Sequence, residues 1–206
     1  MGLMHAILLG CLQGVTEFLP VSSSAHLVAA QALLGAEEPG IYLEVSVHFG
    51  TLLAILVVFG RELVRVARDG VRGTWLWLHG AGAEELRRYA PRLRTAVAVV
   101  VGTLPAAFAG VLLGERVEAA FESVPTAGAF LMVTGFILLG SRLARPGRTE
   151  EPGAVRGLLV GIAQALALLP GISRSGSTIV AGRLLGMERA AAARFSFVLA
   201  VPALIG

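Results

Sequence analysis

Long apolar runs that rarely meet a charged residue constrain the fold of this chain more than any other feature. Three of them, at residues 41–60, 95–114 and 127–143, approach the roughly 20 residues that an α-helix needs to cross about 30 Å of hydrocarbon. A fourth run occupies residues 190–206. Only 15% of the residues are charged, against about 25% in soluble domains, which is too few to cover a water-facing surface. We therefore predict an all-α polytopic membrane protein with at least four transmembrane helices, forming a single membrane domain over residues 1–206.

Two further apolar stretches are interrupted by a proline and a turn rich in serine and glycine. The first, residues 3–34, breaks at Pro20, and the second, residues 157–187, breaks at Pro170. Each half has about 15 residues or fewer, which is too short to cross the bilayer, so each stretch predicts a re-entrant helical hairpin. Irregular backbone at membrane depth is tolerated only where protein or a water-filled cavity satisfies its polar groups. Both turns should therefore be buried and polar.

The two broken stretches resemble each other, with their prolines at positions 20 and 170. Three spans lie between them, so the second stretch must enter the membrane from the opposite face, which predicts an inverted-topology repeat. The first repeat covers about residues 1–143, and the second begins near residue 156. Because two more spans follow residues 41–60 in the first repeat, we expect about two further helices to complete the second repeat after residue 206.

Arginine residues in the polar segments indicate the orientation of the chain. Residues 61–94 carry eight Arg against four acids and residues 142–156 four Arg against two, whereas residues 115–125 carry three Glu and one Arg. Because cytoplasmic loops retain basic residues, we expect the two Arg-rich loops in the cytoplasm and the acidic loop outside. The first hairpin then enters from outside and the second from the cytoplasm, so their turns should meet near the midplane. The same rule accounts for the net charge of +3, and we expect no nucleic-acid partner.

Polar groups gather around the first turn, and polar groups inside a membrane segment are costly and typically functional. Gln13 and Glu17 are four residues apart on one helix face, and Ser23 and His26 are three apart on the next half-helix. Hard oxygen ligands suit Mg²⁺ or Ca²⁺, so Gln13 and Glu17 are candidate ligands of a divalent cation that shields phosphate charge. His26 is a candidate for proton transfer, and Ser23 for the nucleophile or a phosphate ligand.

The second turn has the composition of an anion site. A Gly/Ser turn at a helix N-terminus offers free backbone N–H groups and the positive end of the helix dipole, and Arg174 adds a planar fork suited to phosphate oxygens. We therefore expect a diphosphate headgroup as the ligand. The other candidate phosphate contacts are Ser22, Ser24, Gly171, Ser173, Ser175, Gly176, Ser177 and Thr178. Taken alone, each serine is more simply a hydrogen-bond partner within or between helices.

At these residues the chain resembles the undecaprenyl-diphosphate phosphatase family, also called bacitracin-resistance proteins. The first family motif is similar to QGVTEFLPVSSSAH at residues 13–26, and the second to PGISRSGST at residues 170–178. The resemblance implies removal of the terminal phosphate from undecaprenyl diphosphate, which recycles the lipid carrier for cell-wall synthesis. It also implies a divalent cation and a multi-pass protein of the plasma membrane whose active site is open to the outer side. A homodimer is compatible with this interpretation.

The resemblance assigns roles to particular residues. Its catalytic positions correspond to Glu17, Ser23, His26 and Arg174, and its phosphate-binding turn to Ser173 and Thr178. Gln13 takes a position where many members have Glu, and His48 stands where a Gln is expected. The attacking group remains open between Ser23, His26 and water. Two other functions also remain open: a lipid-carrier flippase or transporter, because broken helices in inverted repeats are a transporter design, and a sensing or structural protein without turnover. His26 beside Ser23 and Glu17 favours the enzyme.

Overall fold

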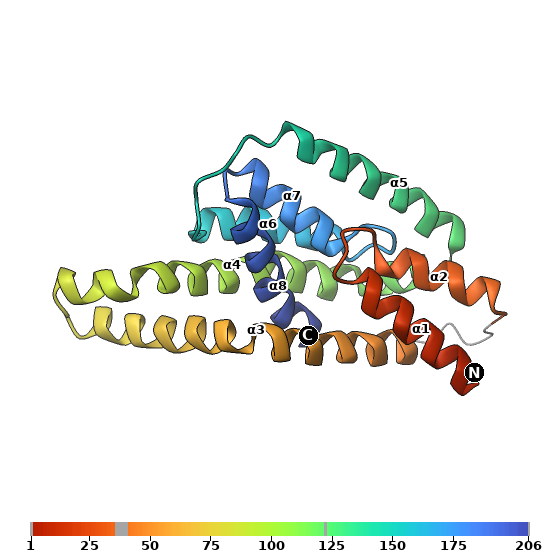
Figure 1. The fold of residues 1–206 in the computed structure, drawn as a ribbon, viewed down its shortest axis with the longest axis horizontal. Coiled ribbons are helices and arrows are strands. Elements are labelled where there is room, and N and C mark those ends of the chain that lie inside the picture. Colours follow the sequence, from red (N-terminus) through yellow and green to blue (C-terminus); the bar gives the residue numbers. More distant parts are fainter. Residues whose placement is uncertain (1, 36–40, 122, 206) are drawn as a thin grey trace.

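A computed structural model describes residues 2–35, 41–121 and 123–205, and this part of the chain is all-α (Figure 1). Some residues that the sequence predictions cover lie outside the described residues. They include residue 1 of the predicted domain, residue 122 of the acidic loop and residue 206 of the last span. The elements in chain order are α1 Leu3–Thr16, α2 Ser23–Leu33, α3 Ile41–Leu78, α4 Ala83–Phe121, α5 Val124–Gly140, the 3-10 helix η1 Ser141–Leu143, α6 Ala154–Leu166, α7 Arg174–Leu184 and α8 Arg189–Ile205.

Three helical segments in the described part of the chain are long and apolar enough to cross a membrane. They are Val45–Leu78 in α3, Ala83–Phe121 in α4, and Val124–Leu143 in α5 together with η1. The first overlaps the predicted run at 41–60, and the other two contain the runs at 95–114 and 127–143. The predicted fourth span corresponds to α8, which has 17 residues and extends about 26 Å. α8 is therefore shorter than the other three. The membrane class and the all-α fold are confirmed, with three candidate spans by length and composition.

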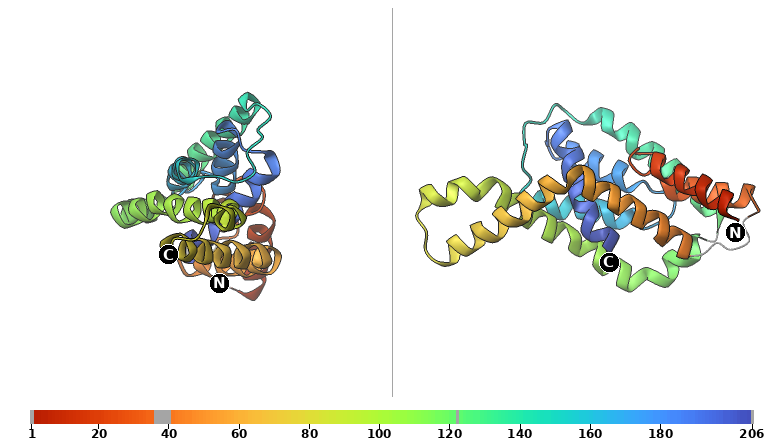
Figure 2. Two further views of the ribbon diagram at one scale, coloured as in Figure 1. Left: turned by 90° about the vertical axis from the view of Figure 1, so that its left-hand side faces the viewer. Right: turned by 60° about the horizontal axis from the view of Figure 1, so that its bottom comes forward.

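The Arg-rich segment at 61–94 is not the loop that its charge predicted. α3 has 38 residues and extends about 57 Å, and α4 has 39 residues, so the two helices continue well beyond the thickness of a hydrocarbon core. Their connected ends project past the rest of the molecule (Figures 1 and 2). Asp69 on α3 pairs with Arg92 on α4 at 3.0 Å, and Gly70 lets the helices approach so closely that a Cβ there would lie 2.7 Å from the Ala96 Cβ. This packing explains why charged residues do not end either helix.

The predicted acidic loop at 115–125 is likewise mostly helical, because α4 runs to Phe121 and α5 begins at Val124. Ser123 caps α5 by accepting a hydrogen bond from the Thr126 N–H at 3.3 Å. The connection between the two helices is therefore much shorter than its polar composition suggested.

The core lies where α4, α6, α7 and α8 meet. Its buried side chains are Ala98, Val160, Met187, Ala191, Ala192, Phe195 and Leu199. α4 and α6 are in backbone contact, because a Cβ at Gly102 would lie 2.7 Å from the Gly157 carbonyl oxygen, and a Cβ at Gly161 would overlap the Gly102 carbonyl. Small residues allow membrane helices to approach in this way. The α4–α6 contact fixes the position of the second helix pair, α6–α7.

The two broken stretches form two pairs of short helices, α1–α2 and α6–α7, whose connecting turns lie side by side (Figures 1 and 2). Hydrogen bonds join the turns: among them, the Gly171 N–H donates to Ser24 Oγ at 3.1 Å, and Ser175 Oγ donates to the Leu19 carbonyl at 3.2 Å. Each second helix begins at a serine cap, Ser22 for α2 and Ser173 for α7. The fold thus brings together two helix N-termini that are far apart in the sequence.

Candidate functional site

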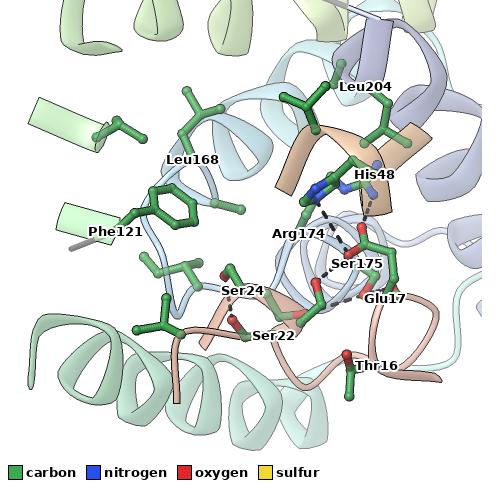
Figure 3. A pocket seen from close by; sticks show the side chains of 18 of the residues that line it. Thr16, Glu17, Ser22, Ser24, His48, Phe121, Leu168, Arg174, Ser175 and Leu204 are labelled. Carbon is green, nitrogen blue, oxygen red and sulfur yellow. Dashed lines mark hydrogen bonds and ion pairs between the residues drawn. The ribbon is translucent and has the colours of Figure 1, made fainter. Parts of the chain in front are cut away.

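A cavity of about 1000 Å³ lies between the two turns and the facing parts of α2, α3, α4 and α8 (Figure 3). Its wall is divided by chemistry. The polar residues at the two turns and on the facing helices are Thr16, Glu17, Ser22, Ser23, Ser24, His48, Gln164, Ser173, Arg174 and Ser175, and Gln31 and Glu118 are further polar residues of the wall. The apolar part includes Val28, Phe49, Leu52, Phe121, Leu168 and Leu204. A ligand with a charged head and a hydrocarbon chain matches this division.

Glu17 lies at the centre of the polar part, directly after α1 ends at Thr16. The carboxyl oxygen Oε2 accepts hydrogen bonds from Gln13 Nε2 at 2.8 Å and from Ser23 Oγ, and it lies 3.9 Å from His48 Nε2. Oε1 accepts a hydrogen bond from Arg174 Nη2 in an ion pair that connects the two turns. The side chains of Glu17 and Arg174 are only 7% and 18% exposed. Each buried charge is therefore balanced chiefly by the other.

Each turn contains a residue with positive φ, a backbone conformation that persists only where neighbouring residues stabilise it. Ser22, the cap of α2, has φ 65° and is the one non-glycine residue with positive φ in the described ranges. Such a conformation costs about 1–3 kcal/mol and persists only where the surroundings enforce it. Gly171, with φ 103°, leaves no space for a Cβ beside the Ala127 carbonyl on α5. The two turns are therefore held in place before any ligand binds.

Thr134 on α5 supports the second turn from behind. Its hydroxyl donates to the Gly171 carbonyl at 2.6 Å and accepts from the Ser173 N–H at 2.9 Å. The Ser173 hydroxyl in turn accepts from the Gly176 N–H at 3.0 Å, as the cap of α7. These contacts fix the N-terminus of α7, where Arg174 begins the helix. Sequence reasoning missed Thr134, because nothing local connects it to a turn some 40 residues later.

The structure brings only part of the predicted set into the cavity wall. The predicted residues in the wall are Glu17, Ser22, Ser23, Ser24, Ser173, Arg174 and Ser175. Six predicted residues do not line the cavity: Gln13, His26, Gly171, Gly176, Ser177 and Thr178. Gln13 contacts Glu17 from behind, and Thr178 forms a hydrogen bond of 2.6 Å with Ser196 on α8. The closing threonine of the motif thus holds α7 against α8.

Two histidines lie close to the site in different ways. His26 Nδ1 is 2.7 Å from the Ser22 carbonyl oxygen. A carbonyl only accepts, so Nδ1 carries the proton and Nε2 of the neutral ring retains its lone pair. His48, on α3, lines the cavity and faces Glu17. The sequence indicated His48 only as a weaker candidate, because it is a titratable residue inside an apolar span, and such residues default to functional candidates.

The oxygen donors around Glu17 can be compared with the needs of a divalent cation. No three His, Cys, Asp or Glu side chains in the described ranges come together as metal ligands. Mg²⁺, however, commonly takes one or two carboxylates and completes its shell with water and substrate phosphates. The Gln13 amide oxygen, Oε1, is buried without a hydrogen-bond partner within the described structure, and Gln13 also contacts Glu17. Glu17 and Gln13 therefore fit a hard cation that binds together with phosphate.

The chain is similar to known proteins over nearly its whole length. A family model described as "Bacitracin resistance protein BacA" matches residues 6–206. A protein named undecaprenyl-diphosphatase from Desulfosudis oleivorans is 46% identical over 205 residues, which cover 98% of this chain and 74% of the relative. Proteins of the same name from Thermomicrobium roseum and Desulforapulum autotrophicum are 44% and 41% identical over the whole chain, covering 74% and 75% of their own lengths. The chain thus spans about three quarters of these relatives.

Proposed function

Because the chain belongs to the bacitracin resistance protein BacA family, we propose that it hydrolyses undecaprenyl diphosphate to undecaprenyl phosphate and inorganic phosphate. The observation that carries this proposal is the buried Glu17–Arg174 ion pair between two helix N-termini, at the polar end of a cavity with an apolar wall. Both helix N-termini and Arg174 favour an anion. The apolar wall accommodates the first part of a polyprenyl chain.

Arg174 is the principal phosphate contact. Its guanidinium has five donors in a planar fork, and Nη1 is buried without a hydrogen-bond partner among the described residues. A diphosphate that enters the cavity offers oxygens to this free donor and competes with Glu17 for Nη2. When the phosphate replaces Glu17 at Nη2, the Glu17 carboxylate loses its counter-charge. Glu17 and Gln13 are the residues that would hold Mg²⁺ or Ca²⁺ there, and the ion would neutralise phosphate charge.

Ser23 is the attacking group that the geometry favours. Its hydroxyl already donates to Glu17, so the carboxylate is placed to accept the proton as Oγ bonds to the terminal phosphorus. The bond between that phosphorus and the bridging oxygen breaks, and undecaprenyl phosphate leaves. Water then cleaves the phosphoserine, with His26 Nε2 as the proton acceptor. Direct attack by water, with His26 as the base, is the alternative mechanism.

The proposed topology is an inverted repeat in the plasma membrane, with α1–α2 and α6–α7 as re-entrant hairpins. The contact between their turns supports this arrangement. We place the Arg-rich end of α3 and α4 in the cytoplasm. The cavity is lined by Val117, Glu118 and Phe121, at the end of α4 remote from the Arg-rich end, which supports an opening to the outer side.

The test is phosphate release from undecaprenyl diphosphate by the purified protein in detergent, with and without a chelator. We expect release that depends on divalent cation and is lost in Arg174→Lys, because an ammonium group cannot replace the planar fork. Arg183→Lys, also on α7 but outside the cavity wall, is the matched control and should retain activity. Binding of the lipid without phosphate release would refute the phosphatase and favour a transporter.

A further inference from the structure

Gln164 on α6 is a buried side chain that the proposed reaction does not yet use. It is 2% exposed, and neither its amide nitrogen nor its amide oxygen has a hydrogen-bond partner within the described part of the chain. Buried polar groups almost always have partners, and an orphaned one destabilises the fold. Gln13, the other buried glutamine, differs because its Nε2 is anchored on Glu17. The partner of Gln164 must therefore come from outside the described residues.

Gln164 lines the cavity, so a hydrogen-bond partner from outside the chain can reach it from there. Gln164 lies in the last turn of α6, and Ala167 and Leu168 follow directly after the helix ends at Leu166; all three line the cavity. Arg174, in the same wall, also has a buried donor without a partner. Two unsatisfied N–H donors therefore line the same cavity from the two sides of the second turn. A polyprenyl chain has no acceptor for either, whereas a phosphate group has several.

We propose that Gln164 is a further substrate-binding residue, whose side-chain N–H donates to a phosphate oxygen while Arg174 binds the same phosphate-containing group. The inference rests on the proposed function. The Gln164 amide oxygen accepts a hydrogen bond from water that enters with the hydrated headgroup. Gln164 thereby extends the anion site from the start of α7 to the end of α6, across the second turn.

The proposal predicts that stability and affinity change in opposite directions. Gln164→Met keeps the length and the helix propensity of the side chain and removes only the orphaned amide. Without ligand, the melting temperature of the variant should equal or exceed that of the wild type. The KM for undecaprenyl diphosphate should rise about tenfold, the effect of losing one hydrogen bond to a charged group. A glutamine whose partner is a protein group would show the reverse: lower stability and unchanged KM.

The experiment measures three quantities for the full-length protein in detergent: the melting temperature without ligand, the KM for undecaprenyl diphosphate, and the inhibition constant of inorganic phosphate. A rise in KM alone assigns Gln164 to the phosphate nearer the lipid, and a parallel rise in the inhibition constant assigns it to the terminal phosphate. Leu166→Met, on the same helix at an exposed side chain outside the cavity wall, introduces the same residue and is the matched control. An equal rise in KM there would overturn the specific role of Gln164.

The outcomes separate this inference from the proposed function. If the wild type releases no phosphate, the proposed function is wrong. If the wild type is active and Gln164→Met has the same KM, only the inference about Gln164 is wrong. Should the Met variant fail to fold, Gln164→Asn provides the second test. It keeps the amide group but shortens the side chain by one methylene, which draws the amide back from the ligand. A folded Asn variant must then show a raised KM, and an unchanged KM would overturn the proposal.

Discussion

The Glu17–Arg174 pair permits a quantitative test of the site in the absence of turnover. The single changes Glu17→Gln and Arg174→Met each remove one charge and leave the other buried. Breaking a buried ion pair in this way costs about 3–5 kcal/mol, because the remaining charge is desolvated without compensation. The side-chain exposures of 7% and 18% justify the buried value. If the two changes were independent, the double variant would lose about 6–10 kcal/mol.

We expect the double variant to lose no more than the worse of the two single variants, because it leaves no unpaired charge. The free energy of unfolding in mixed detergent, measured for the four proteins of this cycle, gives the coupling energy directly. Arg92→Met is the control: Arg92 is 43% exposed, and Asp69, although only 6% exposed, keeps its second partner Arg68 at 2.9 Å, so the loss of Arg92 should cost about 1 kcal/mol or less. Additive losses at Glu17 and Arg174 would refute the view that the two charges balance each other.

The same variants test the exchange of partners at Arg174. Glu17→Gln removes the competing carboxylate, so inorganic phosphate should bind Arg174 more tightly than in the wild type. Phosphate should then raise the melting temperature of Glu17→Gln more than that of the wild type. Arg174→Met should show no phosphate response. An equal response in the wild type and Glu17→Gln would show that Glu17 does not restrain Arg174.

Three further predictions concern catalysis, topology and packing. Glu17→Ala and His26→Ala should each reduce turnover about 10²-fold or more and be non-additive, and His26→Ala should alter the pH profile while leaving the dependence on divalent cation intact; wild-type turnover and pH dependence in His26→Ala would make His26 structural. Cysteines introduced at residues 115–121 should react with an impermeant reagent in intact cells and those at 79–82 should not, and the reverse labelling would contradict the orientation. Gly161→Ala should lower stability by about 1–3 kcal/mol or more, because its Cβ overlaps the Gly102 carbonyl, whereas Gly135→Ala, with open space around it, should be neutral in unfolding measurements.

The sequence was sufficient for those features that depend on neighbouring residues. Apolar runs of span length predicted α3, α4 and α5, and Pro20 and Pro170 marked the turns within the broken stretches. The serine caps were also predictable, because a Ser/Gly turn before an apolar run is a local signal. Membrane class, helix pairs and most of the charged site followed from these local rules.

Features that depend on tertiary contacts were not predictable in this way. Arginines in 61–94 lower the hydropathy but do not end a helix, and the pair between Asp69 and Arg92 that stabilises the extension joins residues 23 apart. His48 and Gln164 acquire their significance only because α3 and α6 place them in one cavity. One sequence contains no information on such pairings until the helices are placed in space.

The direct backbone contact between α4 and α6 determines which half of the site can move. Where Gly102 on α4 meets Gly157 and Gly161 on α6, backbone packs directly against backbone, so α6 and the turn that follows it are expected to move with α4 as one body. Arg174 and Gln164 belong to this body, whereas Glu17 and Ser23 belong to α1 and α2, which are joined to it through the hydrogen bonds between the turns. We therefore expect entry of the lipid headgroup to displace the α1–α2 pair against a stationary α4–α6–α7 unit, so that the carboxylate withdraws from the guanidinium rather than the guanidinium from the carboxylate.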